Sequence, residues 1–440
     1  MKKTFSGGFH IHDYKELTNS KSVTKLPDFD EHIFPLRQHI GAELTPLVSV
    51  GDKVCVGQKI ADSDVFMSVP VHSSVSGTVT AIKPHLHPNG TLVNSIFVEN
   101  DKLYTVCNSA NPVRNFDSLS VEEMLNIVRE KGLVGMGGAG FPTFIKLNPG
   151  KKIDYLIVNG AECEPYITSD HRRMLENPNE LIDGLKIAMK ILSLNHAYFG
   201  IEANKKDAIK VMTEAVSDNP EISVAVLKTK YPQGAEKQLI KAITKRSVPS
   251  GKLPADVGVV VLNIDTVFNL AKAFFEGMPP IKKIVTITGD CVNEPQNFEV
   301  RTGVPFSFLF EQAGGFKTAP EKVIAGGPMM GTAQFNLTAP VIKTTSALIA
   351  LSHAPAVFDE QSPCIRCGKC VDYCPMHLMP LNISRFAIAE NYDLAEKYHA
   401  VDCIECGLCS YICPSNRNPV EFIRRAKQAI IAKKKQQGGK

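Results

Sequence analysis

Two cysteine-rich runs decide how the C-terminal part of this chain can fold: CIRCGKCVDYCP at residues 364–375 and CIECGLCSYICP at residues 403–414. Both have the spacing C-x-x-C-x-x-C-x-x-x-C-P, and eight of the 12 cysteines lie in them. A disulfide framework is typical of a small secreted domain, whereas this chain has 440 residues and begins without an apolar leader segment. The pattern therefore predicts that the eight thiols bind metal.

The two runs resemble the cluster-binding runs of bacterial ferredoxins, in which the fourth cysteine of each run reaches the other cluster. Structural zinc is the alternative, but it commonly uses two separate C-x-x-C pairs and fits the repeated runs poorly. Because each run supplies one cysteine to the other run's cluster, the two clusters lie close together and can pass single electrons between them. The resemblance implies one [4Fe–4S] cluster on Cys364, Cys367, Cys370 and Cys413, and a second on Cys374, Cys403, Cys406 and Cys409.

Upstream of the cysteine runs, apolar strands alternate with amphipathic helices. This alternation predicts a parallel sheet with helices on both faces. Ligands of such sheets bind beyond the carboxyl ends of the strands. The expected strands are 153–158, 197–201, 222–227 and 257–262, and the expected helices are 180–192, 205–216, 236–244 and 266–276.

Polar loops follow three of these strands: NGAECEP at 159–165, YPQGAE at 231–236 and NIDT at 263–266. A glycine run, GMGGAGFPT, lies at 135–143 between a helix and the first strand. Glycines of this kind let backbone N–H groups approach a phosphate or a flavin ring without hindrance from a Cβ atom. The loops therefore predict a ligand site at the carboxyl edge of the sheet.

The loops look like those of the flavin- and NADH-binding subunit of respiratory complex I, with its patterns GRGGAGFPTGxK, NADESEP, YxCGEE and NNVET. With the ferredoxin-type C-terminus and the N-terminal β module, most of the chain is similar to the RnfC family, the NADH-facing subunits of ion-translocating ferredoxin:NAD⁺ oxidoreductases. The resemblance implies FMN as cofactor, NAD(H) as substrate and no catalytic acid or base. The site residues that it implies are Gly135, Gly137, Gly138, Gly140, Phe141, Lys146, Asn159, Glu162, Glu164, Gly234, Glu236 and Asn263.

The loops depart from the complex I patterns at five positions, so we expect some contacts to flavin or nucleotide to be lost or rearranged. Met136 replaces Arg, Ala161 replaces Asp, Cys163 replaces Ser, Ala235 replaces the first Glu, and Leu262 replaces the first Asn.

The N-terminal region has short apolar strands, and the pattern V-x-V-G-D-x-V-x-x-G-Q-x-I at 48–60, followed by SGTV, resembles the barrel-sandwich domain of biotinyl and lipoyl carriers. Residues 62–67 contain no lysine for such a modification, so a structural or docking role is expected. Cys55, Cys107 and Cys291 are expected to be buried thiols.

The expected fold class is multidomain α/β. It consists of a barrel-sandwich β module (1–115), a Rossmann-like FMN/NADH domain (116–280), a small α+β, β-grasp-like domain (281–352), an α-helical 2[4Fe–4S] ferredoxin-like domain (353–423) and a basic tail (424–440). Ser120 should open a helix that Gly132 ends, a short helix should fill 305–313, and one helical stretch should span 381–398.

NADH delivers two electrons as a hydride and a cluster accepts one, so the chain should exchange hydride with FMN and pass single electrons through both clusters. The resemblance implies a peripheral subunit on the cytoplasmic face of the cell membrane, bound to integral membrane subunits and to the iron–sulfur subunit that meets ferredoxin. A soluble cobalamin reductase of the propanediol-utilisation type and a non-catalytic iron–sulfur carrier are the alternatives. In residues 1–423 the basic residues are interspersed with acidic ones, and the chain has no Trp. Both features argue against nucleic-acid binding.

Overall fold

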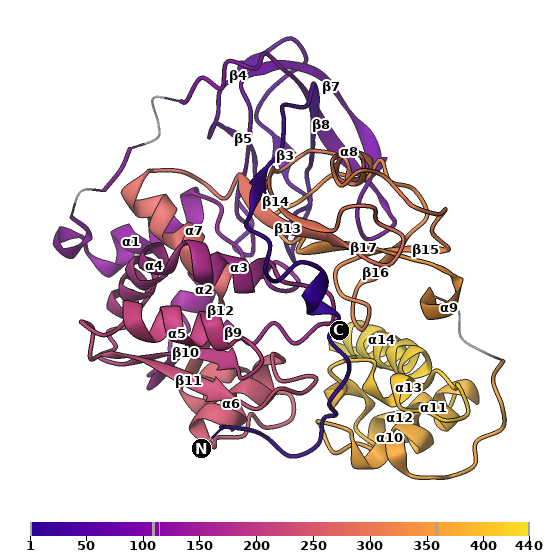
Figure 1. Cartoon of the computed structure of the whole chain (residues 1–440). Helices are drawn as coiled ribbons and strands as arrows, with labels where there is room; N and C mark the ends of the chain where they lie inside the picture. Colours follow the sequence, from indigo (N-terminus) through magenta and orange to yellow (C-terminus); the bar gives the residue numbers. More distant parts are fainter. Residues whose placement is uncertain (1, 108–110, 114, 357–359, 439–440) are drawn as a thin grey trace.

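The computed structural model describes residues 2–107, 111–113, 115–356 and 360–438. Figure 1 shows β-rich structure at the top, an α/β region at the left, a central sheet, and a bundle of short helices at the lower right. The named strands form four sheets. Within the described residues, no helix has both the length and the apolar character needed to cross a membrane.

The predicted parallel sheet is present, with strand order β11-β10-β9-β12 and parallel pairing throughout. Leu156 and Val158 of β9 pack into the core formed with α1, α4, α5 and α7, whereas Ile157 packs with α6 on the other face. Helices therefore cover both faces, as predicted. The elements are β9 (Tyr155–Gly160), β10 (Ala197–Glu202), β11 (Ile222–Leu227), β12 (Val259–Asn263), α1 (Val121–Glu130), α4 (Pro178–Ile191), α5 (Lys206–Ala215), α6 (Glu236–Thr244) and α7 (Ile264–Phe275).

The start of α1 follows the predicted capping pattern. Ser120 Oγ accepts a hydrogen bond from the Glu123 N–H, and the Glu123 carboxylate accepts one from the Ser120 N–H. After α1 the backbone turns at Gly132, where φ is +68°, and enters the glycine loop 135–140. The short helix α2 (Thr143–Leu147) follows that loop. The segment from α1 to α2 thus places the glycine loop at the carboxyl edge of the parallel sheet.

The N-terminal module is a sandwich of two small antiparallel sheets with a shared apolar core, which includes Phe34, Ile60 and Ile96. The expectation of free thiols is wrong for Cys55 and Cys107. Their Cα atoms lie 5.3 Å apart and the two form a disulfide, because the end of the module folds back beside β4. The strands are β2 (Glu31–Pro35), β3 (Thr45–Pro46), β4 (Lys53–Val54), β5 (Lys59–Asp62), β6 (Val71–His72), β7 (Gly77–Leu86) and β8 (Leu92–Asn100).

Residues 2–25 lie outside this sandwich, unlike in the expected module. Lys3 bridges to the edge strand of the parallel sheet, and Thr24 pairs with Phe298 in the central mixed sheet. The segment therefore straps two neighbouring regions together. Cys291 is fully buried and free, as expected, and α8 (Phe306–Gln312) is the predicted short helix. The central strands are β1 (Thr24–Lys25), β13 (Lys282–Thr288), β14 (Gln296–Arg301), β15 (Lys322–Ala325), β16 (Thr332–Gln334) and β17 (Ala347–Leu351).

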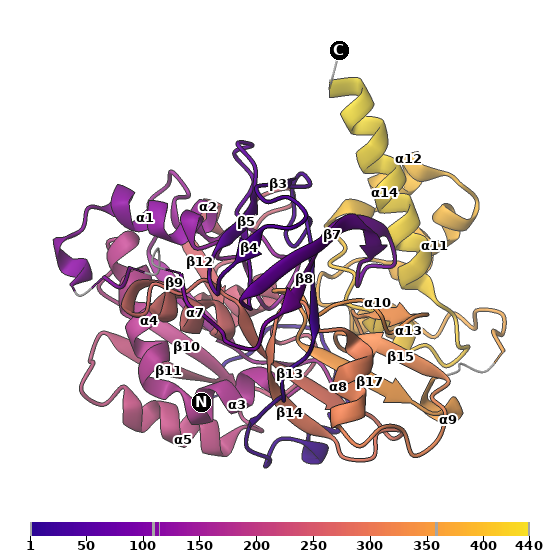
Figure 2. The ribbon, with the colours of Figure 1, turned by 90° about the horizontal axis from the view of Figure 1, so that it is seen from above.

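The C-terminal region is helical, but two expectations need correction. The stretch 381–398 is two helices, because Glu390 has φ +54° and the Asn391 side chain caps the second helix. Residues 424–438 of the basic segment belong to the long helix α14 and do not form a separate tail. This helix buries Ile423 and Ile430 and projects from the body in Figure 2. The helices are α10 (Lys369–Asp372), α11 (Pro380–Ile388), α12 (Tyr392–Lys397), α13 (Leu408–Tyr411) and α14 (Pro419–Gly438).

Candidate flavin site and iron–sulfur centre

The carboxyl ends of β9 and β12 bring two asparagines together. Asn159 and Asn263 are register partners in neighbouring strands. Asn159 Nδ2 donates to the Gly234 carbonyl at 2.8 Å, which holds the loop 231–236 at the same edge. Asn263 Oδ1 accepts from the Asp265 N–H at 2.9 Å and caps α7. The strand-end rule therefore holds here: the three polar loops meet at one edge.

The glycine loop closes over Asn263. A Cβ atom at Gly137 would lie 2.5 Å from Asn263 Nδ2, so a side chain there requires a shift. A Cβ atom at Gly138 would meet nothing within 4 Å, and both glycines are exposed. The loop thus presents an uncovered strip of backbone beside the asparagines, a surface to which a phosphate or a planar ring can come close.

Lys146 of α2, the helix that follows the glycine loop, contacts the start of α6. Its Nζ donates to Glu236 Oε1 at 2.7 Å and to the Val261 carbonyl at 2.9 Å. The side chain is about one-third exposed, so it remains accessible from the site. The cation at this position can bind an anionic phosphate or the electron-rich edge of a ring.

The two acidic residues of the NGAECEP loop are directed elsewhere in the structure. The Glu162 carboxylate accepts from the Asp170 N–H at 2.6 Å, at the start of α3 (Ser169–Glu176). Glu164 is half-buried, and its Oε2 accepts from the Met329 N–H at 3.1 Å. Burial raises the pKa of Glu164 to about 7. These contacts place Glu162 at a helix terminus and join Glu164 to the segment of Met329.

The loop 231–236 also contacts the second cysteine run. The Tyr231 hydroxyl donates to the Cys406 carbonyl at 2.7 Å, and the ring is buried with Cys163 and Leu408. The Gly234 N–H donates to Cys163 Sγ at 3.2 Å. Burial raises the pKa of the Cys163 thiol, which keeps it neutral. The flavin-type loops and the cysteine region therefore share one packed junction.

Four cysteines line a single cavity, and its other walls are apolar, including Pro375, Leu378 and Ile423. Burial raises the pKa of the Cys406 thiol to about 12 and raises that of Cys409 as well. Thiols that line such a cavity suit a metal cluster, because its iron ions stabilise their thiolate forms. We call the four that line it the buried set: Cys406 is buried, and Cys374, Cys403 and Cys409 are half-buried.

The other four cysteines lie closer to the surface. Cys364 and Cys367 are exposed, and Cys370 and Cys413 are half-buried. Burial raises the pKa of the Cys370 thiol, a backbone hydrogen bond from Leu381 lowers it, and the nearby Cys367, Cys413 and Cys364 raise it further. The backbone repeats in the two runs: Gly368 and Gly407, with φ of +80° and +76°, precede α10 and α13. The two runs thus have the same loop-then-helix geometry.

Family models match four consecutive parts of the chain. They are the RnfC barrel sandwich hybrid domain (3–103), the Nuo51 FMN-binding domain (128–272), the SLBB domain (284–333) and the 4Fe-4S dicluster domain (363–417). A subunit of the Na⁺-translocating ferredoxin:NAD⁺ oxidoreductase complex of Acetobacterium woodii is 45% identical over 98% of this chain and 98% of its own length. The chain belongs to the RnfC family.

Further RnfC relatives agree. A subunit of the proton-translocating ferredoxin:NAD⁺ oxidoreductase complex of Clostridium ljungdahlii is 45% identical over 91% of this chain and 88% of its own length. A subunit of the ion-translocating oxidoreductase complex of Haemophilus influenzae is 39% identical over 90% of this chain and 62% of its own length. A chain of an NAD⁺-reducing [NiFe]-hydrogenase has a similar fold, with a TM-score of 0.50 at 18% identity over 75% of this chain and 69% of that chain.

These matches confirm the predicted family, the FMN-binding domain and the two-cluster domain. In this RnfC chain Met136 does not present a side chain to the site: it is buried beside Val69 and Phe144, and its N–H donates to Thr266 Oγ1 at 2.9 Å. The methionine that replaces Arg therefore packs in the apolar core between two domains.

The sequence analysis did not predict the buried charged group beside the glycine loop and the strand ends. Asp265 accepts from Lys283 Nζ and Arg173 Nε, each at 3.1 Å. Burial acts to raise the pKa of Asp265, but the two cations lower it overall. Asp170 lies alongside, accepts from Asn263 Nδ2 at 2.7 Å, and has a pKa raised to about 7 by burial and nearby carboxylates. Asp265 lies within the NIDT segment. Lys283 lies in β13 of another sheet, so no local sequence pattern could predict its ion pair with Asp265.

Proposed function

We propose that this chain is the NAD(H)-reacting subunit of an Rnf-type ion-translocating ferredoxin:NAD⁺ oxidoreductase. It exchanges a hydride between NAD(H) and FMN and passes single electrons through two [4Fe–4S] clusters. The observation that carries this proposal is the hydrogen bond from Tyr231 to the Cys406 carbonyl, because it joins the flavin-type loops to a cysteine of the buried set.

The residues at the sheet edge fit FMN. The uncovered backbone at Gly137 and Gly138 is the cradle that a Cβ atom would fill, and Lys146 supplies a cation beside it. Bound FMN supplies the conversion between a two-electron hydride and single electrons. Asn159 and Asn263 orient the ring system from the strand ends, and Glu236 holds Lys146 in place. Gly135, Gly140, Phe141 and Gly234 shape the same loops, while Glu162 and Glu164 support them from outside.

The cysteine sets fit two cubane clusters. We assign the buried set to the cluster nearer the flavin, because Cys406 contacts the loop of Tyr231. The set that includes the exposed Cys364 and Cys367 then forms the outer end of the path. Leu378 and Ile423 exclude water around the inner cluster. The exposed Cys364 and Cys367 leave the outer cluster accessible to a partner.

We further propose that the chain acts as a peripheral subunit on the cytoplasmic face of the cell membrane. Its partners are integral membrane subunits and the iron–sulfur subunit that meets ferredoxin, since the relatives are named as subunits of ion- or proton-translocating complexes. Affinity purification of the tagged chain from mild detergent extracts should recover hydrophobic subunits. Recovery of cobalamin-processing proteins in their place would favour the soluble reductase.

The direct test is anaerobic. The purified full-length chain, after cluster reconstitution, should contain about eight iron atoms and about one FMN, and NADH should bleach both chromophores. Full iron content without flavin and without bleaching would overturn the proposal and leave an electron carrier. In paired variants, Cys413→Ser should alter the electron paramagnetic resonance signal of the outer cluster, and Cys374→Ser that of the inner one. Cys291→Ser is the matched control because Cys291 is buried in the central sheet region.

A further inference from the structure

The hairpin that joins β5 to β6 lies against the glycine loop of the neighbouring domain. A Cβ atom at Gly41 would collide with the Met67 carbonyl oxygen of the hairpin, and the Ile40 N–H donates to the Gly140 carbonyl at 3.3 Å. Val69 at the hairpin's end is buried against Met136 of the loop. The sandwich module thus supplies a second wall beside the proposed flavin site.

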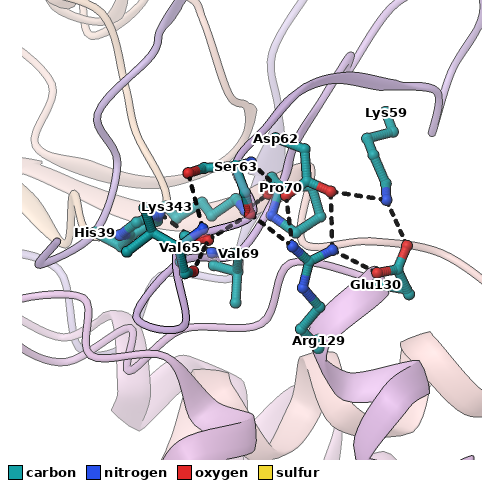
Figure 3. Close-up of polar contacts among 11 residues, drawn as sticks. His39, Lys59, Asp62, Ser63, Val65, Val69, Pro70, Arg129, Glu130 and Lys343 are labelled. Atoms are coloured by element: carbon teal, nitrogen blue, oxygen red, sulfur yellow. Dashed lines mark hydrogen bonds and ion pairs between the residues drawn. The ribbon is translucent and has the colours of Figure 1, made fainter. Parts of the chain in front are cut away.

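The first half of the hairpin is held by ion pairs to α1, shown in Figure 3. Arg129 donates to both oxygens of Asp62, at 2.8 and 2.9 Å, and to the Ser63 carbonyl at 3.0 Å. Lys59 bridges Asp62 and Glu130. A bidentate guanidinium–carboxylate pair fixes orientation as well as distance, so the hairpin is anchored to the helix that leads into the glycine loop.

The second half is held by buried donors. His39 Nδ1 lies 2.9 Å from the Ile40 carbonyl, which makes this nitrogen the donor and leaves Nε2 to accept from the Val69 N–H at 3.3 Å. Lys343 Nζ donates to the Pro70 carbonyl at 2.8 Å and to the Gly132 carbonyl at 2.7 Å. In carrier domains of this fold the same turn bears a mobile arm, whereas here it is immobilised at both ends.

The tip of this fixed hairpin exposes an aromatic ring. Phe66 is 75% exposed, and its ring meets Phe144 edge-to-face with centroids 6.0 Å apart. Phe144 belongs to α2, directly after the glycine loop, and packs against Met136. An exposed aromatic side chain next to a nucleotide-type loop is suited to stacking on a planar ring.

The hairpin lies at one end of the glycine loop, and this position determines which ring of a bound ligand can contact Phe66. The Gly137 end of the loop faces Asn263 and the strand ends, whereas the Gly140 end faces Gln38 and His39 beneath the hairpin. A flavin oriented by the asparagines lies at the first end. A ring at the second end therefore belongs to a longer ligand that extends outward, as a dinucleotide does.

We propose that Phe66 is a stacking platform for the adenine ring of NAD(H), contributed to the site by the sandwich module. The inference rests on the proposed function and names a nucleotide subsite within it. The nicotinamide half meets the flavin at the sheet edge, and the adenine half is held at the hairpin tip. Phe66 is a binding residue and takes no part in hydride transfer.

The test uses the full-length, FMN-loaded chain and separates the two halves of the dinucleotide. In Phe66→Ala, the dissociation constant of ADP-ribose, measured by calorimetry, and the KM for NADH should each rise about tenfold. Reduced nicotinamide mononucleotide, which lacks adenine, should react as with the wild type, and Phe66→Tyr should retain wild-type affinity. Phe335→Ala is the matched control, because Phe335 is 78% exposed beside Gly90 of the sandwich.

Unchanged ADP-ribose and NADH affinities in Phe66→Ala would overturn the platform. An equal loss for NADH and for the mononucleotide would also overturn it, because that pattern indicates a general disturbance of the site. FMN content and melting temperature of each variant establish that the flavin domain is intact. A wild-type protein that binds neither ADP-ribose nor NADH would overturn the proposed function itself.

Discussion

The hydroxyl of Tyr231 donates a 2.7 Å hydrogen bond to the backbone carbonyl of Cys406, across 175 residues of sequence. The Tyr231 ring is 1% exposed, and Cys406 lines the cavity of the buried cysteine set. A buried hydroxyl and a carbonyl thus hold the proposed flavin loop and the proposed inner cluster in fixed relation. We expect this contact to influence how well electrons pass between the two sites.

Tyr231→Phe should weaken that relation without emptying either site. The buried Cys406 carbonyl loses its partner, which costs about 1–3 kcal/mol of stability. We expect unchanged iron and FMN content, a lower melting temperature, and slower reduction of the clusters after mixing with NADH in stopped-flow absorbance. Tyr411→Phe is the control, since Tyr411 is half-exposed. An unchanged cluster reduction rate in Tyr231→Phe would contradict the importance of the contact.

Two neighbouring glycines should respond differently to alanine. In Gly137→Ala the new Cβ lies 2.5 Å from Asn263 Nδ2, so both thermal stability and FMN occupancy should fall. In Gly138→Ala the Cβ enters open space, so stability should hold while FMN occupancy falls, because the added methyl lies on the uncovered face of the loop. Released flavin per chain and melting temperature measure the two effects. Full FMN occupancy in both variants would place the flavin elsewhere.

The disulfide should stabilise the sandwich module. Cys55 and Cys107 are 52 positions apart. A disulfide that closes a loop of that size lowers the conformational entropy of the unfolded chain, which stabilises the folded state by roughly 2–4 kcal/mol. The double variant Cys55→Ser, Cys107→Ser should therefore make the module more sensitive to proteolysis and to denaturant. Cluster and FMN content should remain. Mass spectrometry after alkylation without reductant should find these two cysteines unmodified in the wild type. Full alkylation of both would contradict the pairing.

Lys343 should make stability depend on pH. It is buried, and burial lowers its pKa from 10.5 to about 7. Between these two values the unfolded chain binds the extra proton and the folded chain does not, so stability rises with pH. From pH 7 to pH 9 the gain is about 2 kcal/mol, because the folded-state amine is still half protonated at pH 7.

Lys343→Met removes the titrating group, so the difference in stability between wild type and variant should change with pH over this window. Denaturant titrations of both proteins at pH 7, 8 and 9 measure it. Lys245→Met is the control, because Lys245 follows α6 at the surface of the α/β region. Parallel pH profiles for wild type and Lys343→Met would show that Lys343 stays charged in the folded protein.

Local patterns predicted much of this molecule because neighbouring residues suffice to encode them. The capping box at Ser120, the helix 236–244 and the strand 222–227 all occur where the periodicity placed them. The helix expected over 381–398 breaks at Glu390, where a left-handed backbone conformation turns the chain so that α11 and α12 can both pack against α14. Apolar periodicity alone does not register such a turn.

The ligand types could be predicted from local sequence alone: eight cysteines at cluster spacing, glycines beside strand ends, and asparagines where those strands stop. These depend on short-range spacing. Only the tertiary structure decided which cysteine set lies beside Tyr231, which charges support Asp265, and that Phe66 of one module stands at the glycine loop of another. Those relations join residues separated by many positions, and packing and desolvation across domain boundaries select them, so no local pattern records them.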